Sequence, residues 1–430
     1  MNVLVTVLFA IVFFGCILVS IALHEIGHMV PAKRFGVRVP QYFVGFGPTM
    51  WSTTRGETEY GVKWIPLGGF VRLLGMYPPA KPGASEVGNK LRQLSETARG
   101  YEWSEITPDD VANDRLFYQK KTWQKLIVMA GGPMMNVFIA FGIFWAILGL
   151  HGSYQPQPVV AEVQQCIVRE NQPADAACPT PDTPAALAGI RPGDRVTEFN
   201  GVAITDYPQL QALIRANLDG PAQVVVQRDG QQVALAPVHT VIGGVPDTLD
   251  PGKRVAAGWF GIVPTTVLVK GGPVEVVQQM WTMTEQSVVA IAQFPAKVYH
   301  VVADMVQGKP RDIYGPLSIV GASRAAGEVV ANDGLGVTDK LVLFGSLLGA
   351  INLFLALFNF VPLPPLDGGH IAGALWEAAR RGWARLLHKP DPGYFDTAKL
   401  LPVAYAVMGF LIISGGALIV ADIVSPMQLF

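Results

Sequence analysis

The residues of this chain best suited to chemistry are His24, Glu25 and His28, which form the motif His-Glu-Ile-Gly-His. Two histidines four residues apart lie one above the other on one face of a helix, so both imidazoles can reach a single Zn²⁺ ion. A glutamate beside the first histidine can take a proton from water bound to that ion. The motif therefore indicates zinc-dependent hydrolysis with Glu25 as the general base.

The surroundings of the motif favour a functional site over a surface helix that carries two histidines by chance. The run before it, residues 3–23, is uncharged and long enough to cross a bilayer. Ionisable groups at the end of such a run are costly unless they are paired or bind an ion. Lys33 and Arg34 follow and mark the expected headgroup boundary. At about 1.5 Å per residue, His28 lies roughly 8 Å and His24 roughly 14 Å below that boundary, so the expected metal site is inside the membrane.

Composition and hydrophobic runs indicate a polytopic α-helical membrane protein with one soluble domain. Half of the 430 residues are hydrophobic, 15% are charged, and the formal net charge is −1, a balance without a basic tract that argues against nucleic-acid binding. The expected parts are a first transmembrane helix with the zinc motif at 1–32, a loop at 33–125, a second transmembrane helix at 126–150, a folded domain at 151–266, amphipathic helices and a linker at 267–340, a third transmembrane helix at 341–370, a loop at 371–400 and a fourth transmembrane helix at 401–422.

The basic residues predict the orientation of these spans. The loops at 33–125 and 371–400 carry Lys and Arg close to the membrane, whereas the tail after the fourth span carries none. Because cytoplasmic loops are enriched in Lys and Arg, both loops are expected in the cytoplasm and both termini outside. The domain at 151–266 is then extracytoplasmic, and the metal site lies near the cytoplasmic side.

Residues 55–74 are expected to form a membrane-associated β-hairpin, with two short strands around a Pro-Leu-Gly-Gly turn. An edge strand of this hairpin could pair with an unwound substrate, which makes Gly68, Gly69 and Phe70 candidate substrate-binding residues. The stretch from 76 to 115 looks like an irregular or mobile insertion, and no chemistry is assigned to it.

The middle region has the turn residues of a small α/β domain. Residues 184–196 predict a short helix ending at Gly189, then a tight Pro-Gly-Asp turn and a strand, and Asn200-Gly201 predicts a hairpin. The pattern Ala-x-x-Ala-Gly-Ile-Arg-Pro-Gly-Asp resembles the PDZ domains of bacterial proteases. The alternative is a generic small β domain without a peptide groove.

Two further features flank this domain. Cys166 and Cys178 are close in sequence, and their spacing permits a disulfide if the region is outside the cell. Residues 273–308 read as an amphipathic helix, broken at Pro295, that either lies on the outer membrane face or packs on the PDZ-like domain.

A catalytic zinc usually has three protein ligands, so the chain should supply one more. Asp367 is the candidate, in the stretch 359–369 (Asn-Phe-Val-Pro-Leu-Pro-Pro-Leu-Asp-Gly-Gly). The prolines end the third span as it approaches the cytoplasmic face, on the same side of the membrane as His28. The alternative is that Asp367 caps the helix that follows, and spacing alone supports both interpretations equally.

The order of these motifs resembles the site-2 proteases, and specifically the bacterial PDZ-containing regulators that act on membrane-bound anti-sigma factors. The resemblance implies zinc held by His24, His28 and Asp367, with Glu25 as general base and Asn359 near the substrate. The chain departs from the best-known members in having one PDZ-like pattern instead of two, and in residues 76–115, which have no clear counterpart. The single pattern and the paired cysteines are more similar to the actinobacterial branch. The motifs that carry the resemblance are His-Glu-Ile-Gly-His, Gly-Phe-Gly-Pro at 45–48, Pro-Leu-Gly-Gly-Phe-Val at 66–71, Gly-Gly-Pro-Met-Met-Asn at 131–136, the PDZ-like pattern, Gly-Pro-Leu-Ser-Ile at 315–319 and Leu-Asp-Gly-Gly at 366–369.

The expected function is that of a zinc-dependent intramembrane endopeptidase in the inner membrane of a bacterium. Its substrates would be single-span membrane proteins, such as a trimmed anti-sigma factor or a signal-peptide remnant. Asn359, Pro362 and the hairpin would bind the unwound substrate, and the PDZ-like domain would gate access from outside. Two alternatives are a transporter or channel in which Glu25 relays protons, and a scaffold that uses only the PDZ-like groove. The intact zinc motif with a plausible third ligand argues against both.

Overall fold

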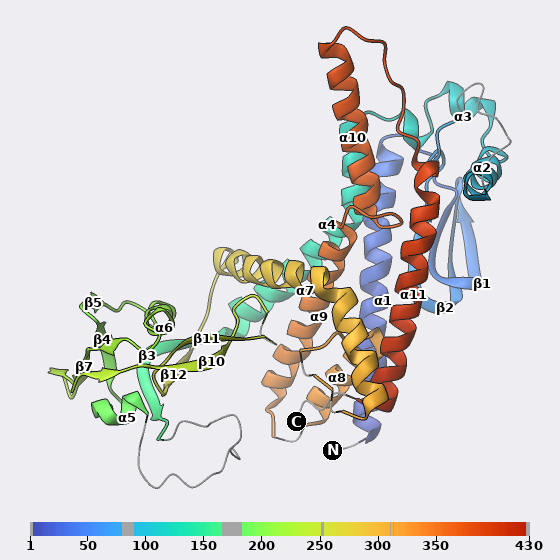
Figure 1. Ribbon diagram of the computed structural model, residues 1–430. Helices are drawn as coiled ribbons and strands as arrows, with labels where there is room; N and C mark the ends of the chain where they lie inside the picture. The colour runs from blue at the N-terminus through green and yellow to red at the C-terminus, as the bar shows by residue number, and fades with distance from the viewer. Residues whose placement is uncertain are drawn as a thin grey trace. The chain divides into compact units, whose positions relative to one another are not determined.

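The computed structural model describes residues 3–79, 90–165, 183–250, 253–309, 311–312, 314–332 and 334–426 (Figure 1). It contains two compact units, one formed by Met1–Trp145 with Val276–Phe430 and the other by Ala146–Glu275. Cys166 and Cys178 lie outside the described residues, so their disulfide stays a prediction.

Among the described residues, four helices are long and apolar enough to cross a membrane, which confirms the four predicted apolar spans. The third is shorter than expected, because three prolines after Asn359 end it and a new helix starts at Asp367. Much of 371–400, expected as a loop, belongs to that new helix. The spans are α1 (Val3–Arg34), α4 (Thr122–Ala146) with a π-helical turn (Ile147–His151), α9 (Val337–Asn359), and α11 (Leu401–Val424) preceded by the 3-10 turn η3 (Thr397–Leu400); the new helix is α10 (Asp367–Leu386).

The predicted hairpin at 55–74 is part of a larger sheet formed by β1 (Gln41–Arg55) and β2 (Thr58–Arg72). Residues 41–44 pair on one side with 59–62 and on the other with 69–72. The predicted strands around Pro-Leu-Gly-Gly therefore exist, but they are not partners, since 41–44 lie between them. Residues 51–55 pair with the outer side of 58–62. The expectation of a simple hairpin was wrong because strand pairing depends on a segment earlier in the chain.

The stretch 76–115, expected to be irregular or mobile, is largely helical where the structure describes it. It contains α2 (Lys90–Trp103) and α3 (Pro108–Ala112), followed by the 3-10 turn η1 (Phe117–Gln119). The carboxylate of Glu102 accepts hydrogen bonds from the backbone N–H groups of Met76 and Tyr77. Arg99 pairs with Asp396 at 2.6 Å, so α2 is held both to the end of β2 and to the chain before α11. These polar partners are distant in sequence, which explains why the local pattern did not reveal the helix.

Two helices follow the second unit and pack on the spans. The helix α7 (Pro273–Gln307) continues through Pro295, where a break was expected, because a proline can remove one backbone hydrogen bond without ending a helix. Its residues Val298 and Val301 pack against Leu418 and Ala421 of α11. The sequence did not predict this partner.

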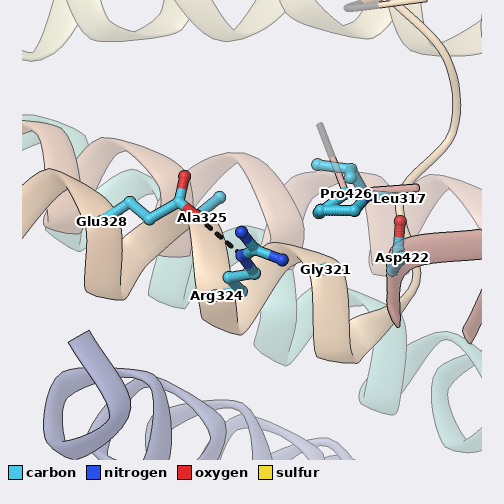
Figure 2. Close-up of a pocket in the computed structure, with 7 residues that line it drawn as sticks. All are labelled: Leu317, Gly321, Arg324, Ala325, Glu328, Asp422 and Pro426. Carbon is cyan, nitrogen blue, oxygen red and sulfur yellow. Dashed lines mark hydrogen bonds and ion pairs between the residues drawn. The ribbon is translucent and has the colours of Figure 1, made fainter. Parts of the chain in front are cut away.

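The helix α8 (Ile319–Ala331) packs along α1, where Gly327 lies against the backbone of Thr6. Asp422 of α11 accepts the backbone N–H of Ser318 at 2.7 Å and pairs with Arg311, which anchors the start of α8. Figure 2 shows α8 from Gly321, which lies near Asp422, to the ion pair between Arg324 and Glu328 in the second half of the same helix.

The second unit confirms the predicted turns. The helix α5 (Pro184–Ala188) ends at Gly189 in the left-handed conformation, and Asn200-Gly201 forms the tight turn between two strands. The helix α6 (Tyr207–Ala216) follows this turn. The main sheet of the second unit has the strand order β12-β3-β4-β7-β8, with β5 paired to β4. The strands are β3 (Ser153–Val163), β4 (Arg195–Phe199), β5 (Val202–Ala203), β7 (Val224–Arg228), β8 (Gln231–Ala234) and β12 (Ile262–Val269), with the pairs β6 (Pro221–Ala222) and β9 (Val238–His239), and β10 (Val241–Pro246) and β11 (Arg254–Trp259).

The side chain of Asp194 holds the Pro-Gly-Asp turn of this unit through hydrogen bonds. Its carboxylate accepts the backbone N–H of Arg191 at 2.8 Å and two hydrogen bonds from the guanidinium of Arg228, at 2.8 and 2.7 Å. Burial raises the pKa of Asp194, but these hydrogen bonds outweigh it and hold the pKa below its ordinary value. The turn therefore joins α5, β4 and β7 through one ionised side chain.

Candidate metal centre

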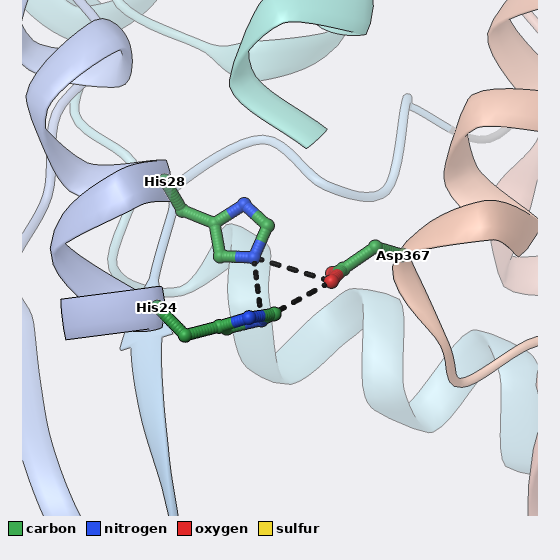
Figure 3. Close-up of side chains that lie close together, drawn as sticks. All are labelled: His24, His28 and Asp367. Atoms are coloured by element: carbon green, nitrogen blue, oxygen red, sulfur yellow. Dashed lines mark hydrogen bonds and ion pairs between the residues drawn. The ribbon is translucent and has the colours of Figure 1, made fainter. Parts of the chain in front are cut away.

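Three side chains predicted as zinc ligands meet at one point in the first unit (Figure 3). Nε2 of His24 and Nε2 of His28 are 3.2 Å apart. Each of these nitrogens lies 3.3 Å from Oδ2 of Asp367. Both histidines are buried, at 8% and 4% exposure, so the meeting point is shielded from bulk solvent.

Both histidines lie on α1, and residues of α4 contact their rings. The Nδ1 atom of His28 lies 2.8 Å from the carbonyl oxygen of Val128, so a proton on Nδ1 is donated there and the lone pair of Nε2 faces Asp367. A Cβ atom at Gly132 would overlap with Nε2 of both histidines. Glycine is therefore required where α4 passes the metal centre, a role that the motif at 131–136 did not reveal from sequence alone.

Asp367 reaches the histidines because of the tight turn before α10. Cβ atoms at Gly368 or Gly369 would overlap with the backbone of residues 360–364, so the two glycines let this helix start directly against the end of α9. The N-cap position of α10 belongs to Leu366, not to Asp367. The carboxylate thus lies beside the imidazoles, and the arrangement differs from the helix-capping alternative.

The arrangement fits a zinc ion. Four ligands about 2.0 to 2.1 Å from zinc in a tetrahedron are about 3.3 Å from one another, close to the three distances of 3.2, 3.3 and 3.3 Å found here. With Nδ1 protonated, the lone pair of His28 faces a carboxylate oxygen, which is repulsive unless a proton or a metal ion lies between them. Two nitrogens and one carboxylate oxygen form the ligand set of many catalytic zinc sites, which leave the fourth position open.

Glu25 lies next to this centre and contacts the edge of the sheet. The backbone N–H of Val71 lies near its carboxylate. A Cβ atom at Gly69 would lie 3.2 Å from Cγ of Glu25, so the strand 69–72 passes directly beside the glutamate. Among the residues that the structure describes, this strand pairs only with 41–44, and its other edge faces Glu25.

Tyr42 fastens the same sheet to α1. Its hydroxyl donates to the carbonyl oxygen of Ala22 at 2.9 Å. Burial and the nearby Glu25 carboxylate raise the pKa of Tyr42 to about 12, so the hydroxyl stays protonated and remains a donor. This hydrogen bond holds the sheet against the part of α1 that carries the zinc motif.

The other predicted substrate-binding residues have structural contacts of their own. The amide of Asn359 donates to the carbonyl of Leu355 in its own helix, at 3.0 Å. Pro362 lies in the turn between α9 and α10. Gly68 passes under the ring of Phe46, and Phe70 stacks on Phe43 with ring centroids 5.6 Å apart. Of the predicted hairpin residues, Gly69 has a described contact with Glu25.

Comparison with known proteins identifies the family. The sequence model of peptidase family M50 matches residues 12–386. The chain is 34% identical to the zinc metalloprotease Rip1 of Mycobacterium tuberculosis and 33% identical to Rip1 of Mycolicibacterium smegmatis, with 98% of each chain covered in both alignments. It is 26% identical to the metalloprotease MmpA of Caulobacter vibrioides over 92% of this chain and 91% of that protein. These matches confirm the resemblance to the site-2 proteases: the chain belongs to peptidase family M50 and is a zinc metalloprotease of the site-2 type.

Proposed function

We propose that this chain is an intramembrane endopeptidase that cuts single-span membrane proteins within or near the bilayer. His24, His28 and Asp367 would hold its zinc ion. The observation that carries the proposal is that these three side chains converge in a triangle of zinc-site dimensions, although Asp367 is more than three hundred residues from the histidines. Trimmed anti-sigma factors and signal-peptide remnants are substrates of the required form.

Glu25 would act as the general base. When bound, zinc acidifies a water molecule and polarises the scissile carbonyl. The Glu25 carboxylate takes a proton from the attacking water and returns it to the leaving nitrogen. The backbone N–H of Val71, which lies near this carboxylate, would hold it in place between these two proton transfers.

The open edge of strand 69–72 would bind the substrate. A transmembrane helix must unwind before its peptide bonds can be cut, and leaving its backbone groups unpaired in lipid costs several kcal/mol each. Pairing with strand 69–72 would replace the lost helical hydrogen bonds beside Glu25. Gly69 suits this role because it has no side chain to obstruct a close backbone approach.

The remaining parts would control access. We place the chain in the bacterial inner membrane, with the metal centre near the cytoplasmic side and the unit 146–275 outside. The turns of that unit support a PDZ-like domain, which would exclude substrates whose outer part is still bulky. Asn359 and Pro362, at the end of α9 and just after it, would line the path of the unwound segment. A proton-relay transporter or a scaffold needs neither the triangular ligand set nor a glutamate held beside an open strand edge.

The proposal is tested with purified protein in lipid nanodiscs and a panel of single-span membrane substrates. We expect cleavage of some members, loss of cleavage with a chelator, and recovery on adding Zn²⁺. Soluble unstructured peptides that are cut faster than every membrane-inserted substrate would contradict the intramembrane assignment. Mass spectrometry of the products locates the cut relative to the bilayer.

A further inference from the structure

A second buried cluster of charges joins α4 to α10. Nζ of Lys125 on α4 lies 3.0 and 3.1 Å from the two carboxylate oxygens of Glu377 on α10. Lys125 is 4% exposed and Glu377 is 3% exposed. Two charges buried this deeply lose most of their hydration, so such a pair adds little net stability and suits a positioning role better.

The carboxylate of Glu377 has two further partners that do not belong to α4. Arg381, one turn further along α10, approaches it to 3.3 Å, and the backbone N–H of Phe395 donates to it at 2.9 Å. The ring of Tyr394 faces both cations, with Nζ of Lys125 5.4 Å and the guanidinium of Arg381 4.9 Å from its centroid. Removal of Lys125 would therefore leave Glu377 still paired.

The same two helices carry the metal centre. Asp367 is the first residue of α10, ten residues before Glu377, or about 15 Å along a rigid helix. On α4, Lys125 precedes Val128 by nearly one turn, and the carbonyl of Val128 orients the ring of His28. One turn of α4 thus contacts both His28 on α1 and the helix α10, which carries Asp367.

We propose that Lys125 and Glu377 position Asp367 against the two histidines. The inference rests on the proposed role of Asp367 as a zinc ligand. The glycine contacts at Gly368 and Gly369 hold the start of α10 against residues 360–364, and the Lys125–Glu377 pair holds the helix laterally to α4. Because metal ligands need placement within about 0.5 Å, loss of the lateral contact loosens the carboxylate without removing it.

The matched test compares Lys125→Met with Arg381→Met. Each variant removes one cation from the same carboxylate, but only the first removes the contact from α4. We expect zinc release to a chelator to be roughly 10 to 100 times faster in Lys125→Met, as for residues that orient metal ligands. In Arg381→Met we expect release within about threefold of wild type. Cleavage by Lys125→Met should fall at limiting zinc and recover partly at excess zinc.

A second readout separates positioning from general stability. We expect the zinc-free forms of Lys125→Met and Arg381→Met to unfold at similar temperatures, since each loses one partner of Glu377. Equal zinc release from the two variants, or wild-type release from Lys125→Met, overturns the inference. If Lys125→Met does not fold, the double variant Lys125→Met with Glu377→Met, which leaves neither partner of the pair as an unpaired charge, must show the same fast release.

Asp367→Ala distinguishes this inference from the proposed function. If Asp367→Ala keeps its zinc with wild-type affinity, the ligand assignment fails, and the positioning role fails with it. If Asp367→Ala loses zinc while Lys125→Met and the double variant keep it, the ligand assignment stands and only the positioning role is rejected.

Discussion

The candidate metal centre and the strand beside it would contribute to the proposed reaction through different kinds of chemistry. The centre consists of side-chain atoms in fixed positions, with Nε2 of His24 and of His28 each 3.3 Å from the carboxylate of Asp367. The strand 69–72 offers backbone groups along an open edge. Substitutions at the centre should therefore act through residue identity, and substitutions in the strand through hydrogen-bonding capacity. Three experiments test this difference and a fourth tests the turn held by Asp194, in order of decreasing expected effect.

The largest effect is expected for Asp367→Ala, which removes one of three proposed ligands. Zinc content should fall to a small fraction of wild type and cleavage should become undetectable. Metal analysis of the purified variant measures this directly. Full zinc occupancy would mean that Asp367 has only a structural role at the start of α10.

Glu25→Gln should separate catalysis from metal binding. Glutamine keeps the size and a hydrogen-bond acceptor for Val71 but cannot take a proton, so cleavage should fall by about 10² to 10⁴. Zinc content should remain that of wild type, because Glu25 is not among the three converging ligands. Cleavage above a few per cent of the wild-type rate would reject Glu25 as the base.

The strand is tested by comparing Gly69→Pro with Gly69→Ala. Both add a Cβ atom close to Glu25, but only proline removes the backbone N–H. That N–H points to the same edge as the N–H of Val71, because alternate residues of a strand share an edge. We expect cleavage roughly tenfold lower in the proline variant than in the alanine variant, with normal zinc in both.

Two neighbouring positions complete the strand experiment. Phe70→Pro removes an N–H that faces residues 41–44, and should destabilise the sheet instead of affecting substrate pairing alone. Val71→Ala keeps every backbone group and should be mild. Equal activity of Gly69→Ala and Gly69→Pro would show that strand addition is not the binding mode.

The smallest effect is expected far from the metal, in the turn held by Asp194. Because its pKa is lowered in the folded state, the stabilisation from this carboxylate is present above the unfolded pKa of about 3.9 and is lost as the pH falls through the lower folded value. Asp194→Asn should speed hydrogen exchange in residues 184–199 roughly tenfold near pH 6. The difference from wild type should shrink as the pH is lowered toward 3. A constant difference would mean that charge is not what holds the turn.

Local patterns predicted the parts of this molecule whose partners are close in sequence. The spacing of His24 and His28 defines one helical face, and Gly189 and Asn200-Gly201 define their turns without help from distant residues. Asp367 could be proposed because zinc requires a third ligand, although spacing alone did not separate this role from helix capping. The resemblance to the site-2 proteases supplied that distinction.

Features that depend on distant partners could not be predicted in the same way. Residues 41–44 separate the two strands of the expected hairpin, and no turn residue indicates this. Arg99 pairs with Asp396, which is 297 residues away in the sequence, and Lys125 pairs with Glu377, which is 252 residues away. A polar residue in a helix gives no sign of which distant charge will pair with it. For this reason the sequence did not predict the helices α2 and α3 or the ion pair between α4 and α10.

The glycine contact between α4 and the histidines also closes one side of the metal centre. A single added carbon at Gly132 would overlap with both imidazoles, so α4 leaves no space for a peptide or a ligand between itself and the zinc position. In the proposed function, the scissile bond approaches from the side of Gly69 and Glu25. For inhibitor design, a zinc-binding group has to be narrow where it faces α4, and its bulk should extend along the edge of the sheet.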